Sequence, residues 1–191
     1  MDSRFILISD IIRARKSEFP STYKSGNIDP KLIDDLISNA LWAPNHKKTE
    51  PWRFVVVYGE KKQELSDFMA EHYLKTTPTD KFDIVKQRKA SEKPLQSGAI
   101  IAICIHRSPE ALIPAWEESA AVACAVQNLW LSCTAIGLGA YWSTPGIIKN
   151  LNEFLQLHEH EECMGLFYMG WSGNPGTERT RNSLDQVRRW L

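Results

Sequence analysis

Three continuous apolar runs constrain the fold of this chain more than any other feature of its sequence. They cover residues 52–58 (WRFVVVY), 99–106 (AIIAICIH) and 162–170 (ECMGLFYMG). Short apolar runs that are rich in β-branched and aromatic residues and lack polar alternation are typical of strands covered on both faces. We therefore expect the first two runs to be buried strands and the third to be another strong strand.

Segments with helical periodicity separate these strands. We expect helices over residues 3–15, 61–74 and 116–136, and a short one over 145–155. Another helix should begin at Pro30, with Asp29 as its cap, and should end before Pro44. Residues 20–27 are interpreted as a loop, 140–142 as a short strand, and the polar stretch 76–93 as a mobile helical excursion. The elements follow no regular βαβ rhythm, so the sequence predicts a single α+β domain over residues 1–191.

Composition excludes several classes of function. Lysine plus arginine and aspartate plus glutamate both number 23, so no overall field attracts nucleic acid or an acidic membrane. The N-terminus lacks the features of a signal peptide, and no apolar run approaches the roughly 18 residues of a membrane span. The four cysteines form no CxxC pair and mostly lie in apolar stretches, which favours reduced, buried thiols and a cytoplasmic protein.

Two groups of basic residues are candidate anion sites. Arg13, Arg15, Lys16 and Ser17 stand at the end of the first expected helix, where two or three cations and a hydroxyl suit a terminal phosphate. Arg179 and Arg181 alternate after the last strand and would point the same way on an extended segment. Each group also has a simpler interpretation. The first could be a basic helix end that complements the helix dipole, and the second could be a solvated tail.

The loop that joins the second helix to the first strand is a third candidate. Two prolines bracket the polar segment 44–51, and His46 within it is flanked by Asn45 and Lys47. Loops at strand edges often carry sites, although a single loop histidine is more often only exposed. Metal and serine hydrolase motifs are absent, and residues 158–162 (HEHEE) fit a solvated turn better than a metal site, so we expect no metal. Residues 137–139 (GLG) come at the end of a helix, whereas a glycine-rich dinucleotide-binding motif precedes a helix whose N-terminus binds the pyrophosphate.

Several short motifs follow one another along nearly the whole chain. Residues 15–17 (RKS) end the first helix, and residues 43–47 (APNHK) come shortly before 50–54 (EPWRF). The alanine-rich helix begins with residues 114–117 (PAWE) and is followed by 137–143 (GLGAYWS). Residues 165–170 (GLFYMG) belong to the last strand. In this order they resemble the short single-domain members of the nitroreductase family. The resemblance implies a homodimeric flavoenzyme whose mixed or antiparallel sheet is flanked by helices.

The resemblance also implies roles for particular residues. Arg15, Lys16 and Ser17 would bind the FMN phosphate and ribityl chain, and Arg179 and Arg181 would close on the phosphate. Trp142, Ser143 and Thr144 would line the isoalloxazine ring, and Trp42 and His46 would come from the partner subunit. The sequence departs from the family pattern at Trp42 and Ser143, where relatives often have Arg, and at Glu50, where they have Gln.

The function implied is transfer of hydride from NAD(P)H through FMN to nitroaromatic, quinone or similar electron-poor acceptors, with ping-pong kinetics. Since the cofactor carries the chemistry, we expect no catalytic side chain. The alternatives are dehalogenation, enone reduction or flavin breakdown on the same fold, and a non-catalytic flavin-binding redox sensor. The sequence does not distinguish NADH from NADPH, and it leaves the physiological acceptor and the flavin potential open.

Overall fold

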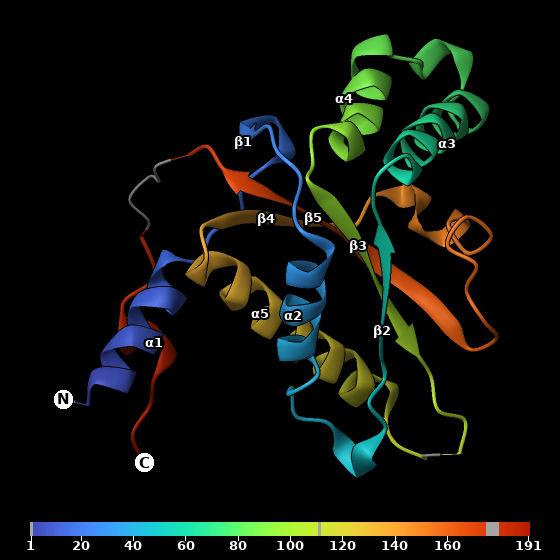
Figure 1. The fold of residues 1–191 in the computed structure, drawn as a ribbon. Helices are drawn as coiled ribbons and strands as arrows, with labels where there is room; N and C mark the ends of the chain where they lie inside the picture. Colours follow the sequence, from blue (N-terminus) through green and yellow to red (C-terminus); the bar gives the residue numbers. More distant parts are fainter. Residues whose placement is uncertain (1, 111, 175–179) are drawn as a thin grey trace.

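A five-stranded antiparallel sheet organises the chain (Figure 1). The computed structural model describes residues 2–110, 112–174 and 180–191. The strands are β1 (Tyr23–Lys24), β2 (Trp52–Val57), β3 (Ala99–His106), β4 (Leu138–Ser143) and β5 (Glu161–Ser172). The long strand β5 pairs with β3, β4 and β1, and β3 pairs in turn with β2. The predicted α+β class with an antiparallel sheet is confirmed.

Helices cover both faces of this sheet. They are α1 (Ser3–Ala14), α2 (Pro30–Ala40), α3 (Lys61–Thr76), α4 (Ile84–Leu95), α5 (Ala115–Ala135) and α6 (Leu184–Val187). Residues of α2 and α5 pack on Ile101, Ile103 and Ile105 of β3. Residues of α3 and of the 3-10 helix η4 (Gly146–Asn150) pack with Ile100 and Ala102, which point to the opposite face. Alternate residues of β3 therefore belong to two apolar cores, as its unbroken apolar run predicts.

Capping residues explain where the first two helices begin. The carboxylate of Asp2 accepts a hydrogen bond from the Arg4 backbone, and that of Asp29 accepts one from the Lys31 backbone. Pro30 occupies the first turn of α2, where its missing N–H costs nothing. The helix α1 has no buried residue, contacts α5, and projects from one side of the molecule (Figure 1).

Some sequence-based expectations about local structure are wrong. The strand β2 is not covered on both faces, because it lies at the edge of the sheet with Arg53 and Val56 exposed. Residues 20–27 contain a 3-10 turn and β1 in addition to loop, and residues 145–155 form only the 3-10 helix η4 followed by turns. The strand β4 is longer than the expected 140–142 because Leu138 and Gly139 already pair with β5.

Part of the polar stretch 76–93 is helical: residues 79–81 form a 3-10 turn, and α4 begins at Ile84 and continues to Leu95. It lies against α3, where the hydroxyl of Ser66 donates to the Ser91 carbonyl at 2.6 Å and the Gln87 amide donates to the Ala70 carbonyl at 3.0 Å. The two helices form a hairpin that projects beyond the sheet (Figure 1). Its mobility remains a prediction.

Candidate functional site

The segment that follows α1 runs directly beside β4. Ser17 forms an isolated parallel bridge with Ala140, and the backbone N–H of Glu18 donates to the Ala140 carbonyl at 2.9 Å. Arg15 caps α1, and its guanidinium lies 4.6 Å from the centre of the Trp130 ring on α5. The side chain of Ser17 is exposed. A guanidinium and a hydroxyl thus lie next to the strand that carries Trp142, Ser143 and Thr144 at its end.

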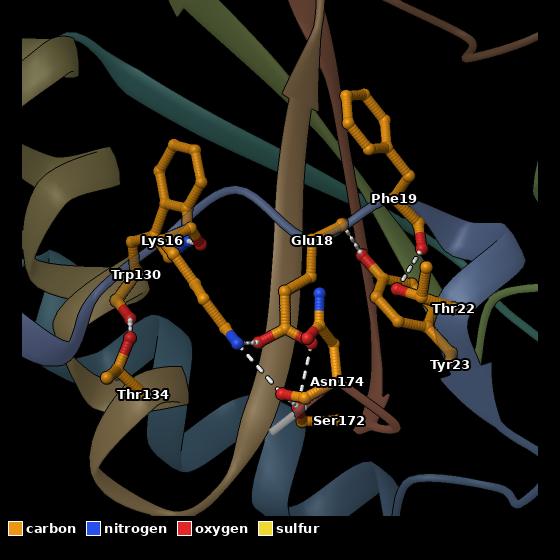
Figure 2. A network of polar contacts seen from close by, with 9 residues as sticks. All are labelled: Lys16, Glu18, Phe19, Thr22, Tyr23, Trp130, Thr134, Ser172 and Asn174. Carbon is orange, nitrogen blue, oxygen red and sulfur yellow. Dashed lines mark hydrogen bonds and ion pairs between the residues drawn. The ribbon is translucent and has the colours of Figure 1, made fainter. Parts of the chain in front are cut away.

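Lys16 takes part in a largely buried polar network (Figure 2). Its ammonium nitrogen lies 3.4 Å from Oε1 of Glu18 and donates to the Asn174 carbonyl at 2.8 Å. The hydroxyl of Ser172 donates to the other oxygen of Glu18 at 2.7 Å. The exposed fractions of the Lys16 and Glu18 side chains are only 14% and 5%, so each charge compensates the desolvation of the other. The network joins the segment after α1 to the end of β5.

A tyrosine completes the support of this segment. The hydroxyl of Tyr23 donates to the Glu18 carbonyl at 2.8 Å and lies 3.1 Å from the Tyr168 carbonyl. Burial, and after it the negative charge of Glu18, raises the pKa of Tyr23 well above its usual value. Tyr23 therefore stays a proton donor throughout the physiological range. Sequence reasoning missed both Glu18 and Tyr23, because each is also held by a residue more than 100 positions away, Ser172 for Glu18 and Tyr168 for Tyr23.

The far end of β4 carries the residues expected to line a ring. Trp142 and Ser143 pair with Phe167 and Leu166 of β5, and the following Thr144 is exposed. In the part of the chain that the structure describes, the indole nitrogen of Trp142 is buried without a hydrogen-bond partner. The indole packs closely on Gly165, where a Cβ atom would come within 2.4 Å of that nitrogen. Trp142 is thus fixed by packing, which orients the backbone of the neighbouring Ser143.

Trp42 and His46 lie at a different place in the fold. Trp42 follows α2 with an exposed fraction of 87%, and the Nδ1 atom of His46 forms an ion pair or short hydrogen bond with Glu117. Glu117 is in the first turn of α5, whereas Trp130, next to Arg15, is in its last turns. Trp130 lies 13 positions after Glu117, which corresponds to about 20 Å at roughly 1.5 Å per residue. Within one protomer His46 therefore lies far from Arg15. Trp42 is held nearer the other end of α5, because the Asn39 carbonyl accepts hydrogen bonds from both the Trp42 backbone and the Asn128 amide.

The second basic group is described only in part. Arg179 lies outside the described residues. Arg181 is exposed, and its guanidinium donates to the Thr180 carbonyl at 2.9 Å. The C-terminal segment from residue 180 lies on the same side of the molecule as α1 in Figure 1. The approach of these arginines to a phosphate held by Arg15 remains a prediction.

A cavity adjoins the segment that follows Thr144. It has a volume of about 220 Å³ and is lined by Met69, His72 and Tyr73 of α3, Ala90 of α4, and residues 145–147. Among the described residues, no three His, Cys, Asp or Glu side chains are grouped as metal ligands. The described helices also include none that is both long and apolar enough to cross a bilayer.

The fold and the candidate site define a class of protein: an α+β domain with a basic helix end beside the strand β4. Comparison with known proteins gives the family. The model of the nitroreductase family matches residues 12–171, and the chain belongs to this family. As a member, it is classed as an oxidoreductase.

Three relatives illustrate the likeness. YfhC of Bacillus subtilis, provisionally named an NAD(P)H nitroreductase, is 27% identical over 169 residues, which cover 86% of this chain and 84% of YfhC. A nitroreductase-like protein of Bacillus cereus has a TM-score of 0.81 at 25% identity, covering 96% of this chain and 95% of that one. A provisional nitroreductase of Desulfovibrio desulfuricans, solved in complex with FMN, has a TM-score of 0.73 at 22% identity, covering 96% of both chains.

The buried network around Lys16 leads to a prediction about stability. Glu18→Gln should lower the free energy of unfolding by about 1–3 kcal/mol, because the largely buried Lys16 ammonium loses its carboxylate partner. Urea unfolding followed by circular dichroism measures the change. The matched control is Glu64→Gln, since the Lys61–Glu64 pair on α3 is exposed and should contribute no more than about 0.5 kcal/mol. Equal effects of the two substitutions would show that the buried Lys16–Glu18 pair stabilises the fold no more than an exposed pair does.

Proposed function

We propose that this chain is an FMN-dependent oxidoreductase that takes hydride from NAD(P)H and reduces electron-poor acceptors such as nitroaromatics or quinones. The observation that carries the proposal is the bridge between Ser17 and Ala140. It sets a basic helix end beside one strand, and that strand leads to the candidate ring surface. The complex of the Desulfovibrio desulfuricans relative with FMN supports the choice of cofactor.

The spacing along β4 fits the shape of FMN. Ala140 marks the phosphate end, where Arg15 and Ser17 supply a guanidinium and a hydroxyl. Thr144 lies four residues further along, which corresponds to about 13 Å at roughly 3.3 Å per residue. A ribityl chain must bridge a separation of this order between phosphate and ring. The donors at the first end are those that a phosphomonoester prefers.

Each residue of the site then has a defined task. Arg15 and Ser17 bind the phosphate, Arg179 and Arg181 close on it, and Lys16 contributes its charge while fixing the segment through Glu18. Trp142, Ser143 and Thr144 line the ring, where backbone N–H groups tune it. Bound FMN supplies the two-electron chemistry, so the protein needs to bind, orient and leave one ring face open. The cavity beside Pro145 is our candidate for acceptor access, and the cytoplasm remains the expected location.

We further propose that the active unit is a homodimer. Arg15 and His46, which are both expected at one flavin, lie near opposite ends of α5. A two-fold axis across α5 sets the helix antiparallel to its copy, so the end beside His46 meets the partner's end beside Arg15. The exposed face of α5 suits close helix approach because it carries Ala120, Ala123, Cys124 and Gln127. In such a dimer Trp42 and His46 complete the partner's site.

The first prediction of this proposal concerns the holoprotein. It should be yellow, release one FMN per chain on denaturation, and lose its flavin absorbance on anaerobic mixing with NADH or NADPH. Steady-state rates with a nitroaromatic or quinone acceptor should give the parallel double-reciprocal lines of a ping-pong mechanism. Flavin that binds but is not reduced by either nucleotide would indicate a redox sensor. Fast reduction with no turnover of these acceptors would point to dehalogenation, enone reduction or flavin breakdown.

Arg15 provides a direct test of the phosphate site. Arg15→Ala should weaken FMN binding by about 10- to 100-fold, because a charge-assisted contact is worth roughly 1.5–3 kcal/mol. Fluorescence titration of the apoprotein with FMN measures the dissociation constant. Arg13→Ala is the control, because Arg13 is exposed one half-turn earlier on the same helix and should leave the affinity within about twofold. An unchanged affinity in Arg15→Ala would place the phosphate elsewhere.

The shared site predicts that assembly and flavin binding are lost together. Light scattering should give twice the chain mass of 21.8 kDa for the wild type. Ala123→Arg introduces a bulky charge on the exposed face of α5 and should yield a monomer that binds FMN at least about tenfold more weakly. Gln63→Arg on the exposed surface of α3 should leave both properties unchanged. A fully active monomeric Ala123→Arg variant is incompatible with a site built from two subunits.

A further inference from the structure

Two cysteines far apart in sequence are directly opposed in the sheet. Cys104 of β3 and Cys163 of β5 are register partners, and both are free thiols. The Cα atoms of directly opposed residues in antiparallel strands are about 4.5–5.5 Å apart. Disulfides form when the Cα atoms are about 4.4–6.8 Å apart. The backbone already holds this pair at a separation that a disulfide accepts.

A β-bulge next to the pair sets its orientation. The register between β3 and β5 shifts between Ile103 and Cys104, because Ile103 pairs with Gly165 and Cys104 with Cys163. Met164 is thereby left as the extra residue of β5. Both cysteines contact the apolar core that packs against α3 and η4. The two thiols therefore share one face of the sheet, which a disulfide requires.

The two thiols differ in exposure and acidity. Cys104 is fully buried, whereas Cys163 is partly exposed. The side-chain interaction with Cys104 lowers the pKa of Cys163, and the same interaction together with burial raises the pKa of Cys104. The thiols of Cys104 and Cys163 donate to the carbonyls of Ala102 and Gly165, respectively. Cys163 is thus the thiol that ionises first and that a small solute reaches. Cys104 stays protonated beside it.

The remaining cysteines lack this arrangement. Cys124 is exposed on α5, and Cys133 is buried on the same helix, where desolvation raises its pKa to about 12. Neither lies opposite another cysteine in the sheet. Cys124 therefore shows how an exposed thiol without a partner reacts, and Cys133 shows how a buried one reacts. Both serve as internal comparisons for the pair.

We propose that Cys104 and Cys163 are a peroxide-reactive thiol pair that closes reversibly to an intramolecular disulfide. The Cys163 thiolate attacks one oxygen of hydrogen peroxide, the O–O bond breaks, and a sulfenic acid forms with release of hydroxide, which takes up a proton as water. The sulfur of Cys104 then displaces the hydroxyl group from Cys163, the S–S bond forms, and a second water leaves. Two thiols and one peroxide give one disulfide and two waters, and an external thiol reductant reverses the change.

Thiol counting and peptide mapping test the pair directly. The holoprotein is treated with stoichiometric hydrogen peroxide, alkylated and digested with trypsin without reduction. Arg107 and Lys149 are cleavage sites that separate Cys104 and Cys163 from each other and from the peptide with the other two cysteines. We expect the thiol count to fall from four to two, a single cross-linked species joining the Cys104 and Cys163 peptides, and full recovery with dithiothreitol.

Variants establish the order of the two steps. Cys104→Ala should leave Cys163 as a sulfenic acid that dimedone traps, whereas Cys163→Ser should leave Cys104 unmodified at the same peroxide concentration. Cys124→Ser is the matched control and should form the disulfide as the wild type does. Because Cys163 is partly exposed, Cys163→Ser keeps the test valid even if the buried substitution at Cys104 impairs folding.

The melting temperature gives an independent readout. The disulfide closes a loop of about 60 residues and should raise the melting temperature of the oxidised protein by roughly 5–10 °C. Retention of four thiols, a cross-link through Cys124, or an over-oxidised Cys163 without a cross-link would each overturn the proposal. These readouts count thiols and do not measure flavin chemistry, so their failure leaves the proposed oxidoreductase function standing.

Discussion

The position of β5 between β3 and β4 determines where the candidate site residues on and beside β4 lie. Residues 165–170 of this strand are all buried, so a shift of one residue would exchange the two apolar cores and is strongly disfavoured. With the register of β5 fixed, Ala140 is set beside Ser17, and Ser143 is set opposite Leu166. The pairing thereby fixes both ends of the candidate flavin site, although no residue of β5 is expected to contact the flavin.

The length of α5 imposes a second constraint. The helix is long enough to separate the basic segment around Arg15 from the loop around His46, and it is rigid because its buried residues pack on the sheet. No side-chain rearrangement closes a gap of about 20 Å. In a two-fold dimer the partner's α5 runs in the opposite direction, and the fold of each subunit stays the same. Both subunits then use the same exposed face of α5 as the interface. The proposed homodimer would bring the end of α5 beside His46 to the partner's end beside Arg15.

The sequence predicted elements whose signals are local, and it failed where the outcome depends on distant neighbours. The unbroken apolar run in β3 and the Asp29–Pro30 start of α2 correctly located those elements. The apolar run in β2 was misread because an edge position is decided by which strand pairs with it. The burial of Glu18 could not be predicted, since its carboxylate meets the hydroxyl of Ser172 and the Lys16 ammonium only in the folded chain. The placement of the predicted site residues around a flavin stays a prediction.

Gly165 connects the thiol pair with the candidate ring surface. A Cβ atom at this position would come within 2.4 Å of the Trp142 indole and 2.7 Å of the Ser143 carbonyl, so the bulge and the end of β4 are in tight contact. A disulfide at Cys163 fixes the strand two residues before that contact. Close packing transmits small displacements because it leaves no void to absorb them. A reduced flavin that loses electrons to oxygen produces peroxide, so the proposed function would itself supply the oxidant of the proposed thiol pair. If both proposals hold, the oxidation state of the two thiols and the geometry of the candidate flavin-lining segment would be coupled through Gly165.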